Sequence, residues 1–166
     1  NEQVTLYPLS MPSIIHEVEQ RLAYEMNVTQ ATIIKPEKWL RALGYAPWVE
    51  AVWVNYISNA IKYGGKPPVI TLGCEQISPV MMRFTVTDNG DGISASDQAR
   101  LFTEFIRLDR DKIAGHGIGL SIVKRIIERL GGEVGVTSVE GDGKGSTFYF
   151  TLPAIDMTKK LIQSEV

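Results

Sequence analysis

The sequence predicts an α+β fold, a two-layer α/β sandwich in which a mixed, mostly antiparallel sheet is covered on one face by about three helices. Three stretches carry apolar residues at helical spacing, near residues 14–26, 47–63 and 117–130. Strand-like segments occur in pairs joined by turn residues, at 69–72 with 80–88 and at 133–139 with 147–152. A doubly wound parallel sheet is disfavoured, because its strands would alternate strictly with helices.

The first third of the chain predicts a strand, a helix and a second short strand. Residues 4–9 alternate weakly in polarity, and Ser10 with Pro12 is typical of a helix start. One face of this helix is apolar and consists of Ile15, Val18, Leu22 and Met26. Residues 32–34 form a short strand ended by Pro36, and residues 37–46 show no clear pattern.

The middle of the chain predicts a second helix followed by a hairpin. Pro47 fits a first helical turn, and Gly64-Gly65 ends the helix. Its apolar stripe consists of Val49, Val52, Trp53, Tyr56, Ile57 and Ala60. The strands at 69–72 and 80–88 flank a turn at Ser78-Pro79.

The last third predicts a third helix, opened by Gly117 and ended by Gly131-Gly132, and then two strands joined by a glycine-rich hairpin loop at 141–145. Two glycine clusters, at 90–92 and 115–119, flank residues 93–114 and predict a mobile flap. We interpret residues 1–154 as one domain and residues 155–166 as a C-terminal tail.

Composition excludes several functional classes. The chain has 166 residues and a net charge of -2, which gives no electrostatic case for nucleic acid or an anionic membrane. Its single cysteine, Cys74, excludes a disulfide framework. No apolar run approaches the roughly 18 residues of a membrane span, and no signal peptide is seen. We expect a cytoplasmic domain without membrane contact, and leave open whether a parent protein is membrane-anchored.

Asp88 is the most informative single residue. Met82, Phe84 and Val86 share its strand parity, so its side chain is expected on the buried face. A carboxylate there costs several kcal/mol unless it accepts hydrogen bonds. An ordinary turn aspartate is the alternative, but Gly90 and Gly92 would let a ligand approach the backbone, which favours a binding site.

A polar row on the second helix provides a facing surface. Asn55, Asn59 and Lys62 project from one side of the helix, and Tyr63 lies beside them. Two amides and an ammonium group suit oxygen ligation of Mg²⁺ and contact with phosphate. A solvated polar face that happens to flank the core is the alternative explanation.

Glycines at the third helix predict a phosphate site. Gly115, Gly117 and Gly119 precede Leu120 and leave backbone N–H groups free at a helix N-terminus, where the dipole favours anions. The spacing is neither that of a dinucleotide-binding fingerprint nor that of a Walker loop.

Taken together, these motifs resemble the ATP-binding catalytic domain of sensor histidine kinases, within the gyrase, chaperone, histidine kinase and mismatch-repair ATPase superfamily (Bergerat fold). The resemblance runs from about residue 4 to 153 and is specific from Trp48 onward. Its boxes, in the family's order, are NYISNAIKY at 55–63, DNGDGI at 88–93, LFTEF at 101–105, GHGIGL at 115–120 and GSTF at 145–148.

The resemblance implies ATP and Mg²⁺ as ligands and a role for each matching residue. Asp88 would accept a hydrogen bond from the adenine amino group, with water and Thr147 as partners, while Gly90 and Gly92 let the nucleotide approach. Asn59 would coordinate Mg²⁺ beside Asn55, and Lys62 would contact phosphate. The adenine pocket would be lined by Tyr63, Ile93 and Leu120. Residues 93–114 would form an ATP lid, anchored by Phe102 and Phe105, with Arg107 reaching the γ-phosphate. Phosphate would be held by the second glycine box, Gly115, His116, Gly117, Ile118 and Gly119.

The same resemblance implies a reaction and partners. Related ATPases carry a glutamate at the position of Asn55, and asparagine cannot take a proton from water, so intrinsic hydrolysis is disfavoured. Transfer of the γ-phosphoryl group to a histidine on a separate dimerisation domain is favoured instead. His16 and His116 are poor acceptors, because His16 lies on the nucleotide domain's own first helix and His116 lies among the lid glycines. We therefore expect a monomeric domain, a homodimeric parent and a response regulator as indirect partner. A degenerate docking module and an intrinsic ATPase are the alternatives.

Overall fold

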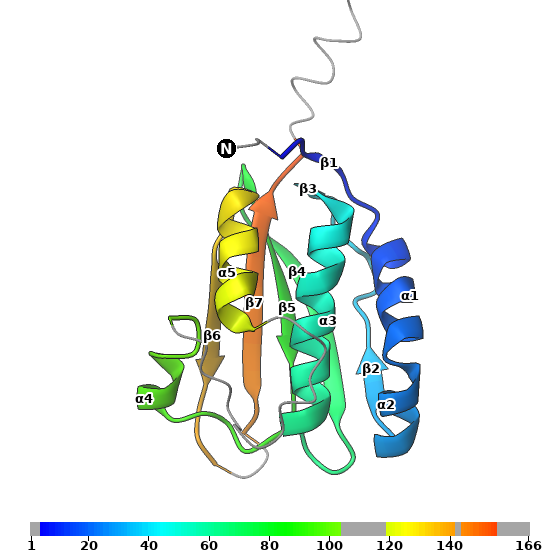
Figure 1. Cartoon of the computed structure of the whole chain (residues 1–166), viewed down its shortest axis with the longest axis vertical. Coiled ribbons are helices and arrows are strands. Elements are labelled where there is room, and N and C mark those ends of the chain that lie inside the picture. Colours follow the sequence, from blue (N-terminus) through cyan, green and yellow to red (C-terminus); the bar gives the residue numbers. More distant parts are fainter. Residues whose placement is uncertain (1–3, 104–118, 142–143, 156–166) are drawn as a thin grey trace, which may run out of the picture.

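The computed structural model describes residues 4–103, 119–141 and 144–155, and its centre is a five-stranded sheet (Figure 1). Only the pairing of β2 with β4 is parallel, and the other three pairings are antiparallel. This confirms the predicted mixed, mostly antiparallel sheet. In their order across the sheet, the strands are β2 (Thr32–Ile34), β4 (Val69–Ser78), β5 (Met81–Thr87), β7 (Ser146–Pro153) and β6 (Val134–Ser138).

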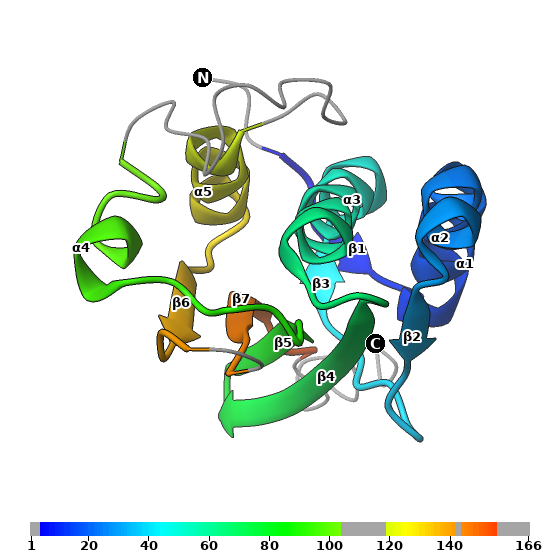
Figure 2. The ribbon, with the colours of Figure 1, turned by 90° about the horizontal axis from the view of Figure 1, so that it is seen from below.

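Helices cover one face of this sheet, as predicted, and the other face carries none of the described helices (Figure 2). The covering helices are α1 (Met11–Arg21), α2 (Ala23–Thr29), α3 (Ala46–Tyr63) and α5 (Leu120–Arg129). A four-residue helix, α4 (Ala95–Gln98), lies beside β6 at the margin of the sheet. No helix among the described ranges is both long and apolar enough to cross a lipid bilayer.

Several element boundaries differ from the predictions. The expected first strand shrinks to β1 (Tyr7–Pro8), which pairs with β3 (Leu43–Gly44) in a small separate sheet. The first helix breaks at Leu22, whose ψ of 9° leaves the helical range, although its side chain stays fully buried. The strand predicted at 69–72 continues to Ser78, because β5 pairs with it along almost its whole length. The predicted lid is described only as far as residue 103 and the predicted tail only at residue 155, because residues 104–118 and 156–166 lie outside the described residues.

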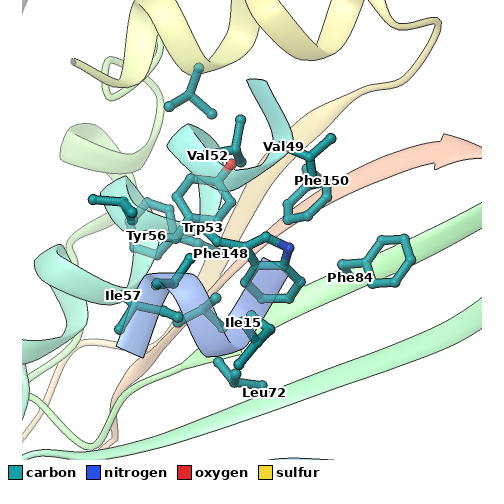
Figure 3. Close-up of a cluster of buried hydrophobic side chains, with 14 of the residues drawn as sticks. Ile15, Val49, Val52, Trp53, Tyr56, Ile57, Leu72, Phe84, Phe148 and Phe150 are labelled. Atoms are coloured by element: carbon teal, nitrogen blue, oxygen red, sulfur yellow. The ribbon is translucent and has the colours of Figure 1, made fainter. Parts of the chain in front are cut away.

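The core fixes α3 on the sheet (Figure 3). Trp53 of α3 is fully buried, and its ring meets Phe150 edge-on at 5.0 Å between centroids. Phe84 stacks on Phe150 at 5.3 Å, so one aromatic group joins α3 to both central strands. Tyr56, one turn further on, donates a hydrogen bond of 2.9 Å to the carbonyl oxygen of Tyr149. Burial of each large apolar side chain contributes about 1.5–3 kcal/mol, which holds the remaining faces of α3 in a defined orientation.

Candidate nucleotide-binding site

A cavity of about 300 Å³ opens where the C-terminal half of α3 meets the loop that follows β5. Ser146 and Phe148, at the start of β7, line it from the sheet. The other lining residues are Asn59, Tyr63, Asp88, Asp91, Gly92, Ile93, Ser94, Asp97 and Glu140. The cavity thus brings together the helical row and the first glycine cluster, two regions that the sequence analysis assigned to one site.

Asp88 lines this cavity and follows β5 directly. Phe84 and Val86 of the same strand are buried, and Asp88, which shares their parity, is half-buried and lines the cavity together with Phe148. Its Oδ1 accepts a hydrogen bond of 2.8 Å from the Gly90 amide, and its own amide donates to the Ser146 carbonyl oxygen at 2.9 Å. Burial raises the pKa of the carboxyl group, and hydrogen bonds with the backbone of Gly90 and Ser146 lower it in part.

Asp97, on the same cavity, has the opposite environment. Its side chain is 48% exposed, and Oδ1 accepts a hydrogen bond of 2.8 Å from Arg100. Hydrogen bonds from Arg100 and Ser94 lower the pKa of this carboxyl group. The two aspartates of one cavity therefore differ in proton affinity because one is desolvated and the other is paired in solvent.

We expect the two carboxyl groups to titrate on opposite sides of the ordinary value of 3.8. In an NMR titration, the chemical shift of the Asp88 carboxyl carbon should change with a midpoint above pH 3.8, and that of the Asp97 carboxyl carbon with a midpoint below pH 3.8. Asp88→Asn and Asp97→Asn assign the two signals. Titration of Asp88 at or below 3.8 would contradict the desolvated setting described here.

Three glycines give the cavity its shape. A Cβ on Gly90 would overlap the carbonyl oxygen of Tyr63, at the end of α3. Gly92 and Gly145 have φ values of 79° and 68°, in the left-handed region that favours glycine. A Cβ on Gly145 would overlap the carbonyl oxygen of Asp88. The close approach of these backbones holds Asp88 between α3 and the hairpin of β6 and β7.

Ser138 at the end of β6 ties the glycine loop to that hairpin. Its Oγ accepts a hydrogen bond of 2.8 Å from the Ile93 amide and donates to the Gly145 carbonyl oxygen at 2.9 Å. Gln98 adds two further bonds, to the carbonyl oxygens of Ile93 and Ser138. Local sequence patterns do not reveal this connection, because Ser138 bonds to Ile93, 45 positions away, and Gln98 bonds to Ser138, 40 positions away.

The helical row divides between three surroundings. Asn59 and Tyr63 line the cavity. Asn55 is 5% exposed, and its Oδ1 accepts a hydrogen bond of 3.3 Å from Asn59. Lys62 is exposed and lines a different cavity, between the C-terminal ends of α2 and α3, so the structure does not bring its side chain to Asp88.

Thr147 does not face the cavity. Its hydroxyl lies 2.9 Å from that of Thr87, on the face of the sheet opposite to the buried Phe148. β7 alternates regularly from its first residue, so the preceding residue, Ser146, takes the inward place and lines the cavity. The side-chain role expected of Thr147 near adenine is therefore better suited to Ser146.

The second glycine box is described only at its end. Gly119 is the N-cap of α5, and Leu120 is buried in the first turn of this helix. The other members of this box, Gly115, His116, Gly117 and Ile118, lie outside the described residues. Phe105 and Arg107 of the predicted lid lie outside them as well. Phe102 is described and half-buried, with its ring 6.3 Å from that of Phe148.

The residues of the cavity fit a nucleotide with its base inward. Four carboxylates line the cavity and would repel phosphate, so an uncharged ring suits the interior. Asp88 offers an acceptor for an amino group, and Ile93 and Phe148 offer apolar contact. The Asn59 side chain can present an amide oxygen, which suits Mg²⁺ when phosphates supply further ligands. Among the described residues there is no cluster of three or more His, Cys, Asp or Glu side chains arranged to hold a metal.

A two-layer fold of this topology, with an aspartate beside two glycines and an asparagine on the facing helix, defines a class of nucleotide-binding ATPase domains. The sequence profile of the histidine kinase-, DNA gyrase B-, and HSP90-like ATPase family matches residues 44–156. The chain belongs to this family. Within it, the chain is the ATP-binding catalytic domain of a sensor histidine kinase, as its relatives indicate.

Relatives are found by sequence and by structure. The adaptive-response sensory kinase SasA of Thermosynechococcus vestitus is 37% identical over 134 residues, 80% of this chain and 35% of the relative. The catalytic domain of histidine kinase ThkA superposes with a TM-score of 0.74 at 22% identity, covering 90% of this chain and 96% of that domain. Full-length ShkA in complex with AMPPNP gives a TM-score of 0.77 at 25% identity, covering 93% of this chain and 32% of that protein. The chain thus spans about a third of the length of the SasA relative.

Proposed function

We propose that this domain holds Mg·ATP in the cavity and presents the γ-phosphoryl group to a histidine on a separate dimerisation and phosphoacceptor domain. The observation that carries the proposal is the half-buried carboxylate of Asp88, held by Gly90 opposite Asn59 and Tyr63 in one cavity. ShkA, a relative of the same fold, is described in complex with AMPPNP, a nucleotide analogue, which supports the choice of ligand.

Several residues in and around the cavity have proposed roles. Asp88 accepts a hydrogen bond from the adenine amino group, while Tyr63, Ile93 and Leu120 pack around the ring. Ser146, in place of Thr147, bonds a water beside Asp88. Asn59, with Asn55 behind it, coordinates Mg²⁺, which when bound neutralises the phosphate charge. Lys62 reaches phosphate through rotation of its flexible four-carbon stem, away from the cavity it lines in this structure. Two further roles rest on the family resemblance alone. Arg107 reaches the γ-phosphate, and the second glycine box holds phosphate; its members are Gly115, His116, Gly117, Ile118 and Gly119.

The chemistry of Asn55 favours transfer over hydrolysis. A buried amide cannot accept a proton from water, whereas a carboxylate in that place could. Positioning and charge neutralisation supply most of the catalysis in phosphoryl transfer, and the domain supplies both to an incoming imidazole. An intrinsic ATPase is therefore the weaker alternative. A degenerate docking module retains the same cavity, so turnover separates it from a kinase.

The proposed partners come from the resemblance to sensor histidine kinases, and they are consistent with a chain that spans 35% of the SasA relative. We infer that the domain is monomeric alone, lies in the cytoplasm and is part of a homodimeric kinase, in which the phosphohistidine passes its group to a response regulator. ThkA, of the same fold, is described in complex with the response regulator TrrA, which supports this assignment. Residues 1–154 constitute the domain and residues 155–166 a tail in this proposal.

The deciding experiment follows radiolabelled phosphate. The 166-residue chain is incubated with [γ-³²P]ATP and Mg²⁺, alone and with the histidine-bearing domain of its own parent protein in trans. We expect label on the added domain, in an acid-labile and alkali-stable form, and negligible phosphate release by the chain alone. Binding without transfer would favour the docking module. Steady phosphate release by the chain alone would favour the ATPase.

A further inference from the structure

Asn89 lies next to Asp88, yet its side chain points away from the nucleotide cavity toward the segment that follows α3. Its Oδ1 accepts two backbone hydrogen bonds, from Gly65 at 2.8 Å and from Val69 at 2.9 Å. Its Nδ2 donates to the Pro67 carbonyl oxygen at 3.2 Å. One side chain thus satisfies three backbone groups of residues 65–69.

These contacts are long-range. In an ordinary Asx turn, the side chain bonds to a backbone group about two residues further along the chain. The partners of Asn89 are 20 to 24 residues away in the sequence and belong to the connection between α3 and β4. Asn89 therefore joins two separate segments and does more than shape its own loop.

The two segments carry opposite sides of the nucleotide site. α3 bears Asn59 and Tyr63 and ends at Tyr63, two residues before Gly65. The loop after β5 bears Asp88, whose carboxylate is bound by Gly90. Gly90 is itself in close approach to the Tyr63 carbonyl oxygen. A shift of the 64–69 segment would therefore move the end of α3 relative to Asp88.

Gly65 makes the arrangement possible. A Cβ on Gly65 would lie 2.6 Å from Nδ2 of Asn89 and 2.9 Å from its Cγ, closer than atoms can pack. The amide fits against the backbone of this segment because no side chain intervenes. Gly65 and Asn89 are thus paired by shape as well as by hydrogen bonding.

We propose that Asn89 is a positioning residue, a polar clamp that fixes the end of α3 against the Asp88 loop and thereby sets the geometry of the adenine pocket. The clamp rests on the proposed nucleotide-binding function, and it acts through Asp88 and Tyr63 without touching the nucleotide. The two bonds that Asn89 accepts, from Gly65 and Val69, are partly buried, and a partly shielded backbone amide without a partner is costly, so loss of these bonds should displace the segment.

The test uses the full chain and three variants. Asn89→Leu keeps the volume but loses all three hydrogen bonds, Asn89→Asp keeps the two that Oδ1 accepts, and Gly65→Ala displaces the amide. We expect Mg·ATP affinity, measured by calorimetric titration, to fall at least tenfold in Asn89→Leu and Gly65→Ala. In Asn89→Asp, the affinity should stay within about threefold of that of the unsubstituted chain. The two losses should be strongly non-additive in the double variant, as expected for one shared interaction.

The control separates positioning from general destabilisation. Thr151→Val removes a hydrogen bond of 2.8 Å that Thr151 accepts from the Glu133 amide, further along β7. This variant should lose thermal stability comparable to Asn89→Leu while its Mg·ATP affinity stays unchanged. Parent-like affinity in a folded Asn89→Leu, or equal loss of affinity in Thr151→Val, would overturn the clamp.

If the unsubstituted 166-residue chain bound no Mg·ATP, the proposed function would fail. The clamp would still be tested by hydrogen exchange. The Gly90 amide, bonded to Asp88 and one residue from Asn89, should exchange at least tenfold faster in Asn89→Leu than in Thr151→Val. Equal exchange of Gly90 in the two variants would show that the two segments are not coupled.

Discussion

Replacing Asp88 with asparagine is expected to lower Mg·ATP affinity about a hundredfold while leaving the fold intact. Asp88 already receives a hydrogen bond from Gly90 on Oδ1, and the second oxygen is the acceptor proposed for the adenine amino group. In the variant, an amide NH₂ would face that amino group, donor against donor. A hydrogen bond to a charged partner contributes about 1.5–3 kcal/mol, which corresponds to a loss of this size. Calorimetric titration measures it.

The matched control is Asp97→Asn, an identical change on the same cavity. Asp97 is bound to Arg100 and is largely solvated, so its loss should alter affinity less than threefold. Unchanged affinity in Asp88→Asn would remove Asp88 from the site.

The stability of Asp88→Asn should at least equal that of the parent at neutral pH. Burial raises the pKa of the Asp88 carboxyl group, so its favourable contribution to the free energy of unfolding is fully present below pH 3.8. That contribution is lost as the pH rises through the raised pKa of the folded state. Asparagine has no such loss, so thermal melts at neutral pH should show a folded and not less stable variant.

Replacing Asn59 with alanine is expected to reduce phosphoryl transfer at least a hundredfold at saturating ATP. Asn59 faces the cavity and is the residue placed to offer an amide oxygen to Mg²⁺. Loss of that ligand would misplace the phosphates, and small misplacement at a reacting centre can cost about a hundredfold. Affinity for ATP in the absence of Mg²⁺ should change little, because adenine contacts remain. The transfer assay and metal-free titrations separate the two effects.

Asn27→Ala provides the control, since Asn27 is exposed on α2, away from the cavity. It should leave both readings unchanged. Transfer by Asn59→Ala at the parent rate, or equal loss of ATP affinity with and without Mg²⁺, would refute the metal role.

What the sequence could predict depended on short-range periodicity. The strand period of two placed Asp88 with Phe84 and Val86, and the helical period placed Asn59 beside Tyr63, since both follow from local geometry. Asn89 and Ser138 were missed because their partners come from distant strands and turns. Such long-range hydrogen bonds depend on how the strands and loops pack in the tertiary structure, which local periodicity does not reveal.

Other differences had a local signal that was not used. The sequence Ser94-Ala95-Ser96-Asp97 has the spacing of a helix N-cap, and the Ser94 hydroxyl does accept a hydrogen bond from the Asp97 amide at 3.3 Å. α4 is four residues long, too short for apolar periodicity to reveal. For Thr147, the strand parity opposite to Phe148 already argued against an inward side chain, and the structure has the regular strand start that places Ser146 inward.

The small sheet sets a tether length. β1 pairs with β3, and Ala42 bridges to Ala154, so both ends of the described domain meet at the far end of β7 from Asp88 (Figure 1). β7 has 8 residues, so this end lies about 25 Å from the cavity at the usual strand rise. An acceptor domain joined before Tyr7 or after Pro153 would have to place its histidine about 25 Å from this joint to reach its own copy's nucleotide, with the linker and the domain together spanning that distance.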